Sequence, residues 1–308
     1  MLEIVTALVP IFVLIVMGFA LRHRGLVADE FWLPCEKLNY FCLFPALMFS
    51  QIATASFGGL SLRPMAMTLL GAVLVGGSIL YAWRLFHPQP GPVFSSVLQG
   101  ALRPNTYVGV AAATALYGQS GLTVTAVAIA IMIPLLNVGS IVVLAIHGKD
   151  GPVDKGRLAK TILTNPVILS VLAGALVNGS GLPVPKAMAS VLTILGGASL
   201  PLGLLAVGAG LDMTAARVSR GPVMQSSVVK LALVPLATYA IGSMLGLRGV
   251  TLSAVVLFNA LPCTPSTYIM ARILGGDHRV AAGIISIQTA LAAVSIPALL
   301  VALTWPQA

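Results

Sequence analysis

Pro104-Asn105-Thr106-Tyr107 and Pro265-Ser266-Thr267-Tyr268 are two similar strings, each with a proline followed two residues later by Thr-Tyr. Each string lies inside a long apolar segment. Within a bilayer, an interrupted helix leaves backbone N–H and C=O groups without partners, which is tolerated only where protein or a water-filled cavity replaces lipid. The two strings therefore predict two broken membrane helices with a functional site beside them. A structural kink at each proline is the alternative interpretation.

The composition indicates a membrane protein with many spans. Of the 308 residues, 58% are hydrophobic and 8% are charged, far from the usage of soluble domains. A helical span needs about 20 apolar residues, so there is room for ten. We expect these spans at residues 4–21, 38–53, 65–83, 93–117, 122–146, 162–177, 188–211, 223–245, 252–274 and 281–303.

Lys and Arg residues are distributed unevenly between the connections. The loops after odd-numbered spans hold eleven of them, whereas the loops after even-numbered spans hold three. Cytoplasmic loops carry the excess of positive charge, so we expect both termini on the outer, periplasmic side of the cytoplasmic (inner) membrane. Topology and lipid contact account for the net charge of +9, and no nucleic-acid partner is expected.

The most polar connection, residues 148–157, divides the chain near its middle. We expect a first five-helix repeat at 1–147, a cytoplasmic linker at 148–157 and a second five-helix repeat at 158–308. Four Pro and Gly residues of the first half have a counterpart of the same type 156 residues later: Pro10 and Pro166, Gly18 and Gly174, Gly25 and Gly181, Pro45 and Pro201.

The odd number of spans in each repeat fixes how the two repeats are related. A second copy of five spans must enter the membrane upside down, as in many secondary carriers. The predicted fold is therefore all-α, a polytopic membrane protein of ten transmembrane helices in two inverted repeats, with helices four and nine broken and crossing. Either Pro262 or Pro265 is the counterpart of Pro104.

The broken helices predict a site for an anion. A proline suits the first turn of a helix, so each string should open a half-helix whose free N–H groups attract negative charge. Arg103 precedes the first break and can bind a carboxylate through two parallel hydrogen bonds; bracing of backbone carbonyls is its alternative role. The predicted substrate-binding residues are Arg103, Pro104, Asn105, Thr106, Tyr107, Pro262, Cys263, Pro265, Ser266 and Thr267.

The other polar residues narrow the substrate class. All eight Asp and Glu residues lie in loops or near predicted span ends, whereas a carrier of cations normally needs a buried carboxylate. The expected substrate is thus a small organic anion. Lys37 and Lys230 are interpreted as reaching the membrane interface. Four amides either line the pathway or bond helices together: Asn39, Asn137, Asn259 and Gln288.

Four longer strings resemble the auxin efflux carrier family, in its bacterial branch, and together they extend over essentially the whole chain. They are Leu38-Asn39-Tyr40-Phe41-Cys42-Leu43-Phe44-Pro45-Ala46-Leu47, Arg103-Pro104-Asn105-Thr106-Tyr107-Val108-Gly109, Gly246-Leu247-Arg248-Gly249-Val250 and Ala260-Leu261-Pro262. The resemblance implies ten spans in an inverted repeat, with Asn105 and Pro262 at the crossing of spans four and nine. It also implies alternating access and, in bacteria, small carboxylate substrates such as malonate or malate.

Two features depart from the plant members of this family. Span 65–83 has no charged residue, and the short stretch 148–157 replaces a long cytoplasmic loop. Auxin and control by phosphorylation are therefore not carried over. The predicted function is a secondary transporter of a mono- or dicarboxylate, with the lipid bilayer as its surroundings and a homodimer as an open possibility.

A membrane-embedded enzyme acting on a lipid or isoprenoid substrate is the alternative function. Such an enzyme needs clustered carboxylates with a metal, or a nucleophile beside a base, and the spans contain neither pattern. The three Cys residues show no metal-ligand spacing, and the four His residues are interpreted as interfacial residues near the cytoplasmic face. No enzymatic activity, cofactor or metal is expected.

Overall fold

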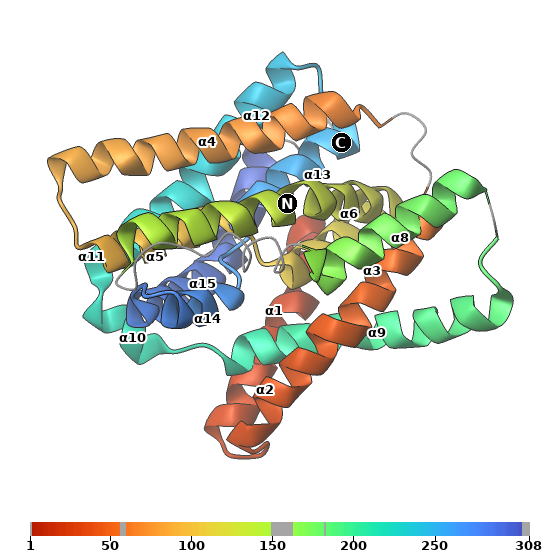
Figure 1. Ribbon diagram of the computed structural model, residues 1–308, viewed down its shortest axis with the longest axis horizontal. Helices are drawn as coiled ribbons and strands as arrows, with labels where there is room; N and C mark the ends of the chain where they lie inside the picture. The colour runs from red at the N-terminus through yellow and green to blue at the C-terminus, as the bar shows by residue number, and fades with distance from the viewer. Residues whose placement is uncertain (1, 56–59, 149–162, 182, 304–308) are drawn as a thin grey trace.

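The computed structural model describes residues 2–55, 60–148, 163–181 and 183–303 (Figure 1). In these ranges the chain is helical, and the only extended pairing is an isolated antiparallel bridge between Pro104 and Cys263. The predicted all-α class is confirmed. Most of the predicted linker, at 148–157, lies outside the described residues.

Six helices in the described ranges are long and apolar enough to cross a membrane. They are α1 (Leu2–His23), α4 (Leu62–Phe86), α6 (Thr106–His147), α9 (Lys186–Ala209), the composite helix Arg220–Met244 and α15 (His278–Leu303). Within α6, Gly118 has a left-handed φ of 59°, and two helical segments meet there at a kink. This kink lies in the predicted gap between the spans 93–117 and 122–146.

The remaining helices are shorter. In the first half they are α2 (Asp29–Leu38), η1 (Asn39–Leu43), α3 (Phe44–Ala53) and α5 (Gly91–Leu102). In the second half they are α8 (Pro166–Ser180), α10 (Met213–Val218), α11 (Arg220–Val228), η2 (Val229–Leu233), α12 (Val234–Met244), α13 (Gly249–Ala260) and α14 (Ser266–Ile273).

Two of these elements, η1 and η2, are π-helical turns inside longer helices. Each is followed by one residue and then a proline, Pro45 or Pro235, whose missing N–H and bulky ring disturb the α-helical hydrogen bonds of the preceding turn. The segment α2–η1–α3 is continuous from Asp29, so this helix begins well before the predicted span at 38–53.

The helices form two groups with α6 in contact with both. In one group α1 packs against α9, and α3 packs against α8 and α9; in the other, α4 packs against α12, and α15 contacts α5, α11 and α13. Figure 1 shows α4 and α12 along one edge of the molecule and α2 and α9 along the opposite edge. The two sequence halves therefore interlock, because α1 and α3 find their partners in the second half.

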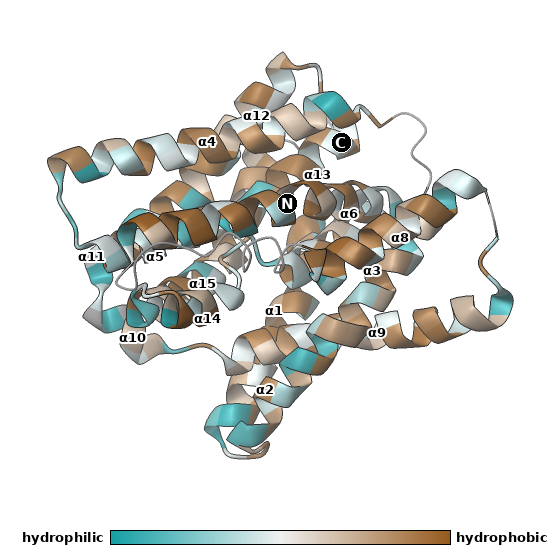
Figure 2. Cartoon of the chain, viewed as in Figure 1, coloured by the Kyte–Doolittle hydropathy of each residue, from teal (hydrophilic) through white to brown (hydrophobic). Residues whose placement is uncertain are grey.

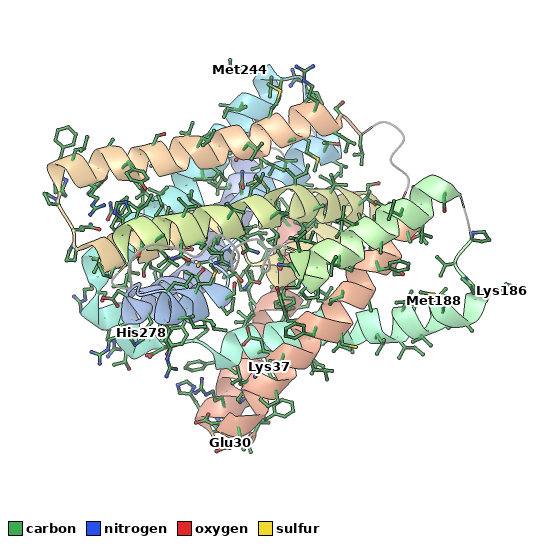
Figure 3. All side chains as sticks on the ribbon, viewed as in Figure 1. Glu30, Lys37, Lys186, Met188, Met244 and His278 are labelled. Atoms are coloured by element: carbon green, nitrogen blue, oxygen red, sulfur yellow. The ribbon has the colours of Figure 1, made fainter. Side chains whose placement is uncertain are left out.

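The distribution of side chains suits a bilayer. Hydrophobic residues follow the lengths of the helices, and hydrophilic residues gather at helix ends and connections (Figure 2). Figure 3 shows Glu30, Lys186 and His278, each close to the start of a helix, at the periphery. Large apolar side chains such as those of Leu172 and Ile194 are exposed at mid-helix, where lipid would cover them.

Candidate functional site

Both predicted helix breaks are present, and they lie side by side. Helix α5 ends at Leu102 and α6 begins at Thr106, while α13 ends at Ala260 and α14 begins at Ser266. The connecting strings pair through the bridge between Pro104 and Cys263. In addition, the backbone N–H of Asn105 donates to the carbonyl of Pro262 at 2.8 Å.

The first half-helix is capped by the side chain of Asn105. Its Oδ1 accepts hydrogen bonds from the backbone N–H groups of Tyr107, at 3.2 Å, and Val108, at 3.4 Å. Asn is among the best residues for this role. Pro104 therefore precedes the cap and does not occupy the first turn. The expectation of free N–H groups is wrong for Asn105 and Tyr107, because both have partners within the protein.

The second half-helix begins differently, with backbone carbonyls as acceptors and no side-chain cap. Pro265 is its N-cap residue, the N–H of Thr267 donates to the carbonyl of Thr264 at 3.1 Å, and the N–H of Tyr268 donates to that of Pro265 at 3.0 Å. These local bonds use N–H groups that were expected to be free. The positive charge of the site therefore comes mainly from a side chain.

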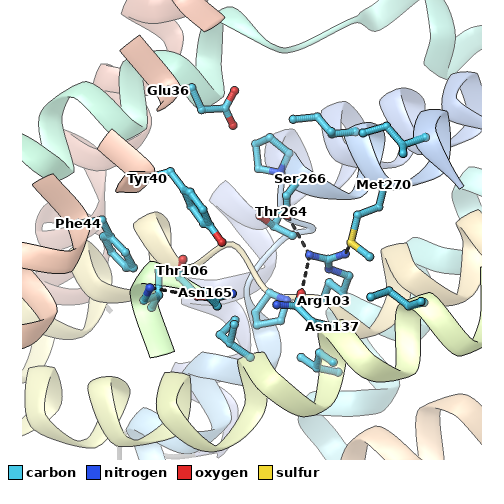
Figure 4. Close-up of a pocket in the computed structure, with 18 of the residues that line it drawn as sticks. Glu36, Tyr40, Phe44, Arg103, Thr106, Asn137, Asn165, Thr264, Ser266 and Met270 are labelled. Atoms are coloured by element: carbon cyan, nitrogen blue, oxygen red, sulfur yellow. Dashed lines mark hydrogen bonds between the residues drawn. The ribbon is translucent and has the colours of Figure 1, made fainter. Parts of the chain in front are cut away.

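A cavity of about 690 Å³ opens beside the two breaks (Figure 4). Its walls come from both broken segments, from α2, η1 and α3, from the last turns of α6 and from the start of α8. Most of the lining is aliphatic or aromatic. The polar and charged lining residues are Glu36, Lys37, Tyr40, Arg103, Thr106, Tyr107, Asn137, Asn165, Thr264 and Ser266.

Arg103 is the buried charge of this cavity, with only 7% of its surface exposed. Its Nη2 donates to Asn137 Oδ1 at 3.2 Å and to Ser266 Oγ at 3.0 Å, and its Nη1 contacts the sulfur of Met270. Figure 4 shows the two hydrogen bonds holding the guanidinium against one wall. All three partners are neutral, so they orient the guanidinium without neutralising its charge.

A carboxylate also lines the cavity, which the sequence did not predict. Because the helix starts at Asp29, Glu36 lies within it, more than one turn inside the helix start. Figure 4 draws Glu36 and Arg103 on opposite sides of the pocket. The charged lining residues are Glu36, Lys37 and Arg103, which together carry one net positive charge.

The predicted site residues divide into two groups. Arg103, Pro104, Thr106, Tyr107, Asn137, Pro265 and Ser266 line the cavity. The other predicted residues are Asn105, Pro262, Cys263, Thr267, Asn39, Asn259 and Gln288, and they are not part of its lining.

Three of the four amides connect helices. Asn39 exchanges hydrogen bonds with Ser199, and Asn259 donates to Thr238 at 2.9 Å. Gln288 accepts from the backbone N–H of Cys263 at 2.9 Å and so supports the second break. Of the four amides, only Asn137 lines the cavity, which was the other interpretation offered for these residues.

Several of the lining residues that were not predicted have a signal in the sequence. Asn165 precedes Pro166 and caps α8, which is a common start for a helix. Thr264 lies within the second proline string, and Met270 lies one helical turn after Ser266 on the same face. Tyr40 and Phe44 are one turn apart in the segment α2–η1–α3 and continue the face of Glu36.

The two lysines behave differently from each other. Lys37 is exposed and lies at the cavity. Lys230 is completely buried, with 0% of its surface exposed, so the interpretation that it reaches the membrane interface is wrong. In the described ranges, no group of three or more His, Cys, Asp or Glu residues could hold a metal ion.

Comparison with known proteins gives consistent matches. Residues 155–300 match a family model described as membrane transport protein. An uncharacterized transporter of Methanothermobacter thermautotrophicus is 25% identical over 291 residues, which are 93% of this chain and 94% of the relative. The uncharacterized transporter YfdV of Escherichia coli K12 is 23% identical over 273 residues, 86% of each chain.

The apolar helices, the paired helix breaks and these matches define a class, that of membrane-spanning transporters. Within this class, the matches agree with the resemblance of the sequence to the auxin efflux carrier family.

Proposed function

We propose that this transporter is a secondary carrier that moves a small organic anion across the cytoplasmic membrane by alternating access. One observation carries the proposal: the buried guanidinium of Arg103 faces a cavity of about 690 Å³ and has only neutral partners in the described residues. A buried charge is costly and marks a functional site. A carboxylate would supply the missing counter-charge through charge-assisted hydrogen bonds.

Ten membrane segments are part of the proposal. In addition to α1, α4, α8, α9 and α15, the segments α2–α3 and α11–α12 each count as one crossing. Helix α6 divides at Gly118 into two parts. Its first part continues α5 beyond the first break, its second part is a crossing of its own, and α13 with α14 completes the set.

Contacts between the two halves support an inverted repeat. Gly18 of α1 lies directly against the carbonyl of Leu205 in α9, and Gly174 of α8 lies against the carbonyl of Phe49 in α3. Residues 18 and 174 are 156 positions apart, and so are residues 49 and 205. A contact made by the first half with the second therefore recurs with the roles of the halves exchanged.

Hydrogen bonds at helix ends recur at the same spacing. Arg22 Nη1 donates to the carbonyl of Ala209 at 2.8 Å, and Asn178 Nδ2 donates to the carbonyl of Ala53 at 3.0 Å. The two donors, and likewise the two acceptors, are again 156 positions apart. Just beyond these donors, Gly25 and Gly181 both adopt left-handed φ angles, of 66° and 67°.

The cavity would face the cytoplasm in the conformation described here. Its lining includes Glu36, Leu144, Asn165 and Leu274. These residues lie close to the connections that follow odd-numbered segments, where Lys and Arg are concentrated. By the charge bias of loops, this side is cytoplasmic and both termini are periplasmic.

The substrate class follows from charge and from the family. The single net positive charge of the lining favours an anion, and the family resemblance narrows this to a mono- or dicarboxylate such as malonate or malate. No observation favours the alternative of an enzyme acting on a lipid or isoprenoid. A homodimer remains a prediction from the sequence.

The experiment compares carboxylates with neutral analogues. The purified chain in liposomes should accelerate entry of labelled malonate or malate and should leave malonamide, the neutral analogue of malonate, at the rate of empty vesicles. Arg103→Ala should lower carboxylate flux about 10- to 100-fold, because a hydrogen bond to a charged group contributes about 1.5–3 kcal/mol. Arg63→Ala removes an exposed arginine outside the cavity and should leave flux unchanged.

Two results would contradict the proposal. Carboxylate flux that is the same in Arg103→Ala and the unaltered chain would remove Arg103 from the site. Equal flux of malonate and malonamide would show that charge does not select the substrate.

A further inference from the structure

Lys230 is a buried cation for which the proposed transport cycle has no use. It is the second residue of η2, its side chain is fully buried, and it does not line the cavity. Its Nζ donates to the backbone carbonyl of Leu102, the last residue of α5, at 3.4 Å. The ammonium group therefore lies at the first helix break.

The surroundings of Lys230 provide no carboxylate. The helices that pack against η2 are α4, α5, α11, α12, α13 and α15. None of these six helices contains Asp or Glu. In the part of the chain that the structure describes, the ammonium therefore donates its hydrogen bond to a main-chain carbonyl.

The end of α5 is a suitable place for a cation. The last carbonyl groups of a helix lack intrahelical partners and carry partial negative charge. In carriers with broken helices, the C-terminal ends of half-helices and the unwound carbonyls near them hold the coupling cation. The carbonyl of Leu102 is one of these groups, since the break follows it directly.

We infer that the ammonium of Lys230 is a built-in cation that occupies, at the end of α5, the position of a small monovalent cation. The unaltered carrier then needs no Na⁺ or K⁺ for transport. Removal of the amine opens a site for a free cation at the Leu102 carbonyl. The inference concerns the helix crossing and does not depend on which anion is carried.

The position of Lys230 supports this role over substrate binding. Arg103 follows Leu102 in the chain, but its guanidinium lines the cavity, whereas Lys230 does not. Around Gly76 of α4, the side chains of Leu102, Val229 and Val234 form an apolar wall beside η2. A tethered ammonium in such surroundings supplies a fixed charge to the helix end without reaching the substrate.

Cation binding by Lys230→Ala is the direct test. The purified variant should unfold at a lower temperature than the unaltered chain, and added ammonium, methylammonium or Na⁺ should raise its Tm saturably by about 2–4 °C. Choline chloride at the same ionic strength is too large for the site and should have no effect. Lys230→Met fills the space with an apolar side chain, so none of these cations should stabilise it specifically.

Several outcomes would overturn the inference. One is the absence of a cation-specific rise of Tm in Lys230→Ala. Another is a rise of the same size in Lys230→Met or in the unaltered chain, because the effect would then arise elsewhere. A third is carboxylate flux through the unaltered chain that falls when choline replaces Na⁺ and K⁺.

A second variant keeps the inference testable if Lys230→Ala does not fold. Lys230→Gln retains an N–H donor for the Leu102 carbonyl but carries no charge. We expect lower stability and at least tenfold lower flux in this variant. If stability and flux are both unchanged, a neutral donor is sufficient and the built-in cation is refuted.

Discussion

Arg103 is held by neutral groups, and this arrangement leaves its positive charge available to an anionic substrate. Asn137 and Ser266 accept hydrogen bonds from the same terminal nitrogen, which leaves the guanidinium oriented but still charged. An acidic residue in place of either acceptor would complete an ion pair inside the protein. The site would then be occupied by its own side chain, and an anionic substrate would have to compete with it.

Asn137→Asp tests this argument at the residue scale. The new carboxylate would lie about where Asn137 Oδ1 now accepts from Arg103, at 3.2 Å. We expect KM for carboxylate transport to rise at least tenfold, because the substrate must displace a charge-assisted bond. Asn137→Ala removes an acceptor without adding charge, so its KM should change less than about threefold. Flux measured against substrate concentration in liposomes distinguishes the two.

The sequence identified Arg103 but not the other charged residues near the crossing. Arg103 could be recognised because it precedes a helix-breaking proline in the middle of an apolar run. Glu36 was placed outside its span because apolar content alone does not reveal that the more polar residues 29–37 belong to the same helix as the apolar residues after them. Lys230 looked close to a span end, and only the packing of six helices around η2 reveals its burial.

Helix contacts at glycines show how closely the elements pack. Gly208 of α9 lies so near α1 that an added Cβ would overlap the carbonyl oxygen of Ile15. Small residues at such crossings let helix backbones approach each other, as is common in membranes. Gly197 of the same helix has open space where a Cβ would be. Close packing of the helix backbones therefore requires glycine at position 208 but not at position 197.

A pair of glycine substitutions tests the α1–α9 contact. Gly208→Ala should lower the Tm in detergent by several degrees, since overpacking costs about 1–3 kcal/mol and backbone atoms have little freedom to move. Gly197→Ala should leave Tm unchanged or raise it slightly, because alanine favours helix and meets no neighbour there. Equal changes in Tm for the two variants would contradict the close approach of α1 and α9.

The helix breaks could be predicted from the sequence, but their details could not. Proline removes a backbone donor wherever it occurs, so the two strings indicated interrupted helices. How the interruption is closed depends on side chains and on distant partners. Asn105 caps its own helix, and its N–H reaches the carbonyl of Pro262, a contact that a local pattern does not contain.

At the scale of the whole molecule, the two sequence halves do not form separate bundles. Helix α1 of the first half packs on α9 of the second, and α3 packs on α8. The recurrence of single contacts at a spacing of 156 residues agrees with the spacing of the Pro and Gly pairs in the sequence. Sequence alone predicted the spacing, whereas the interlocking depends on which faces meet in three dimensions.

The proposed topology can be checked with reporter fusions in Escherichia coli. Alkaline phosphatase attached after residue 308 should be active, and green fluorescent protein attached there should remain dark, because the C-terminus is proposed to be periplasmic. Fusions that end at residue 148 should give the opposite result, since this connection is proposed to be cytoplasmic. A fluorescent fusion after residue 308 would reverse the proposed orientation of the chain and of its cavity.

The antiparallel bridge between Pro104 and Cys263 makes the two helix breaks dependent on each other. If either string formed a continuous helix, its backbone N–H and C=O groups would bond within that helix. Its backbone hydrogen bonds to the other string would then be lost. Closing one interruption would therefore leave backbone polar groups of the other string without hydrogen-bond partners, in a region where lipid offers none. A substitution that closes one interruption is therefore expected to destabilise the other as well.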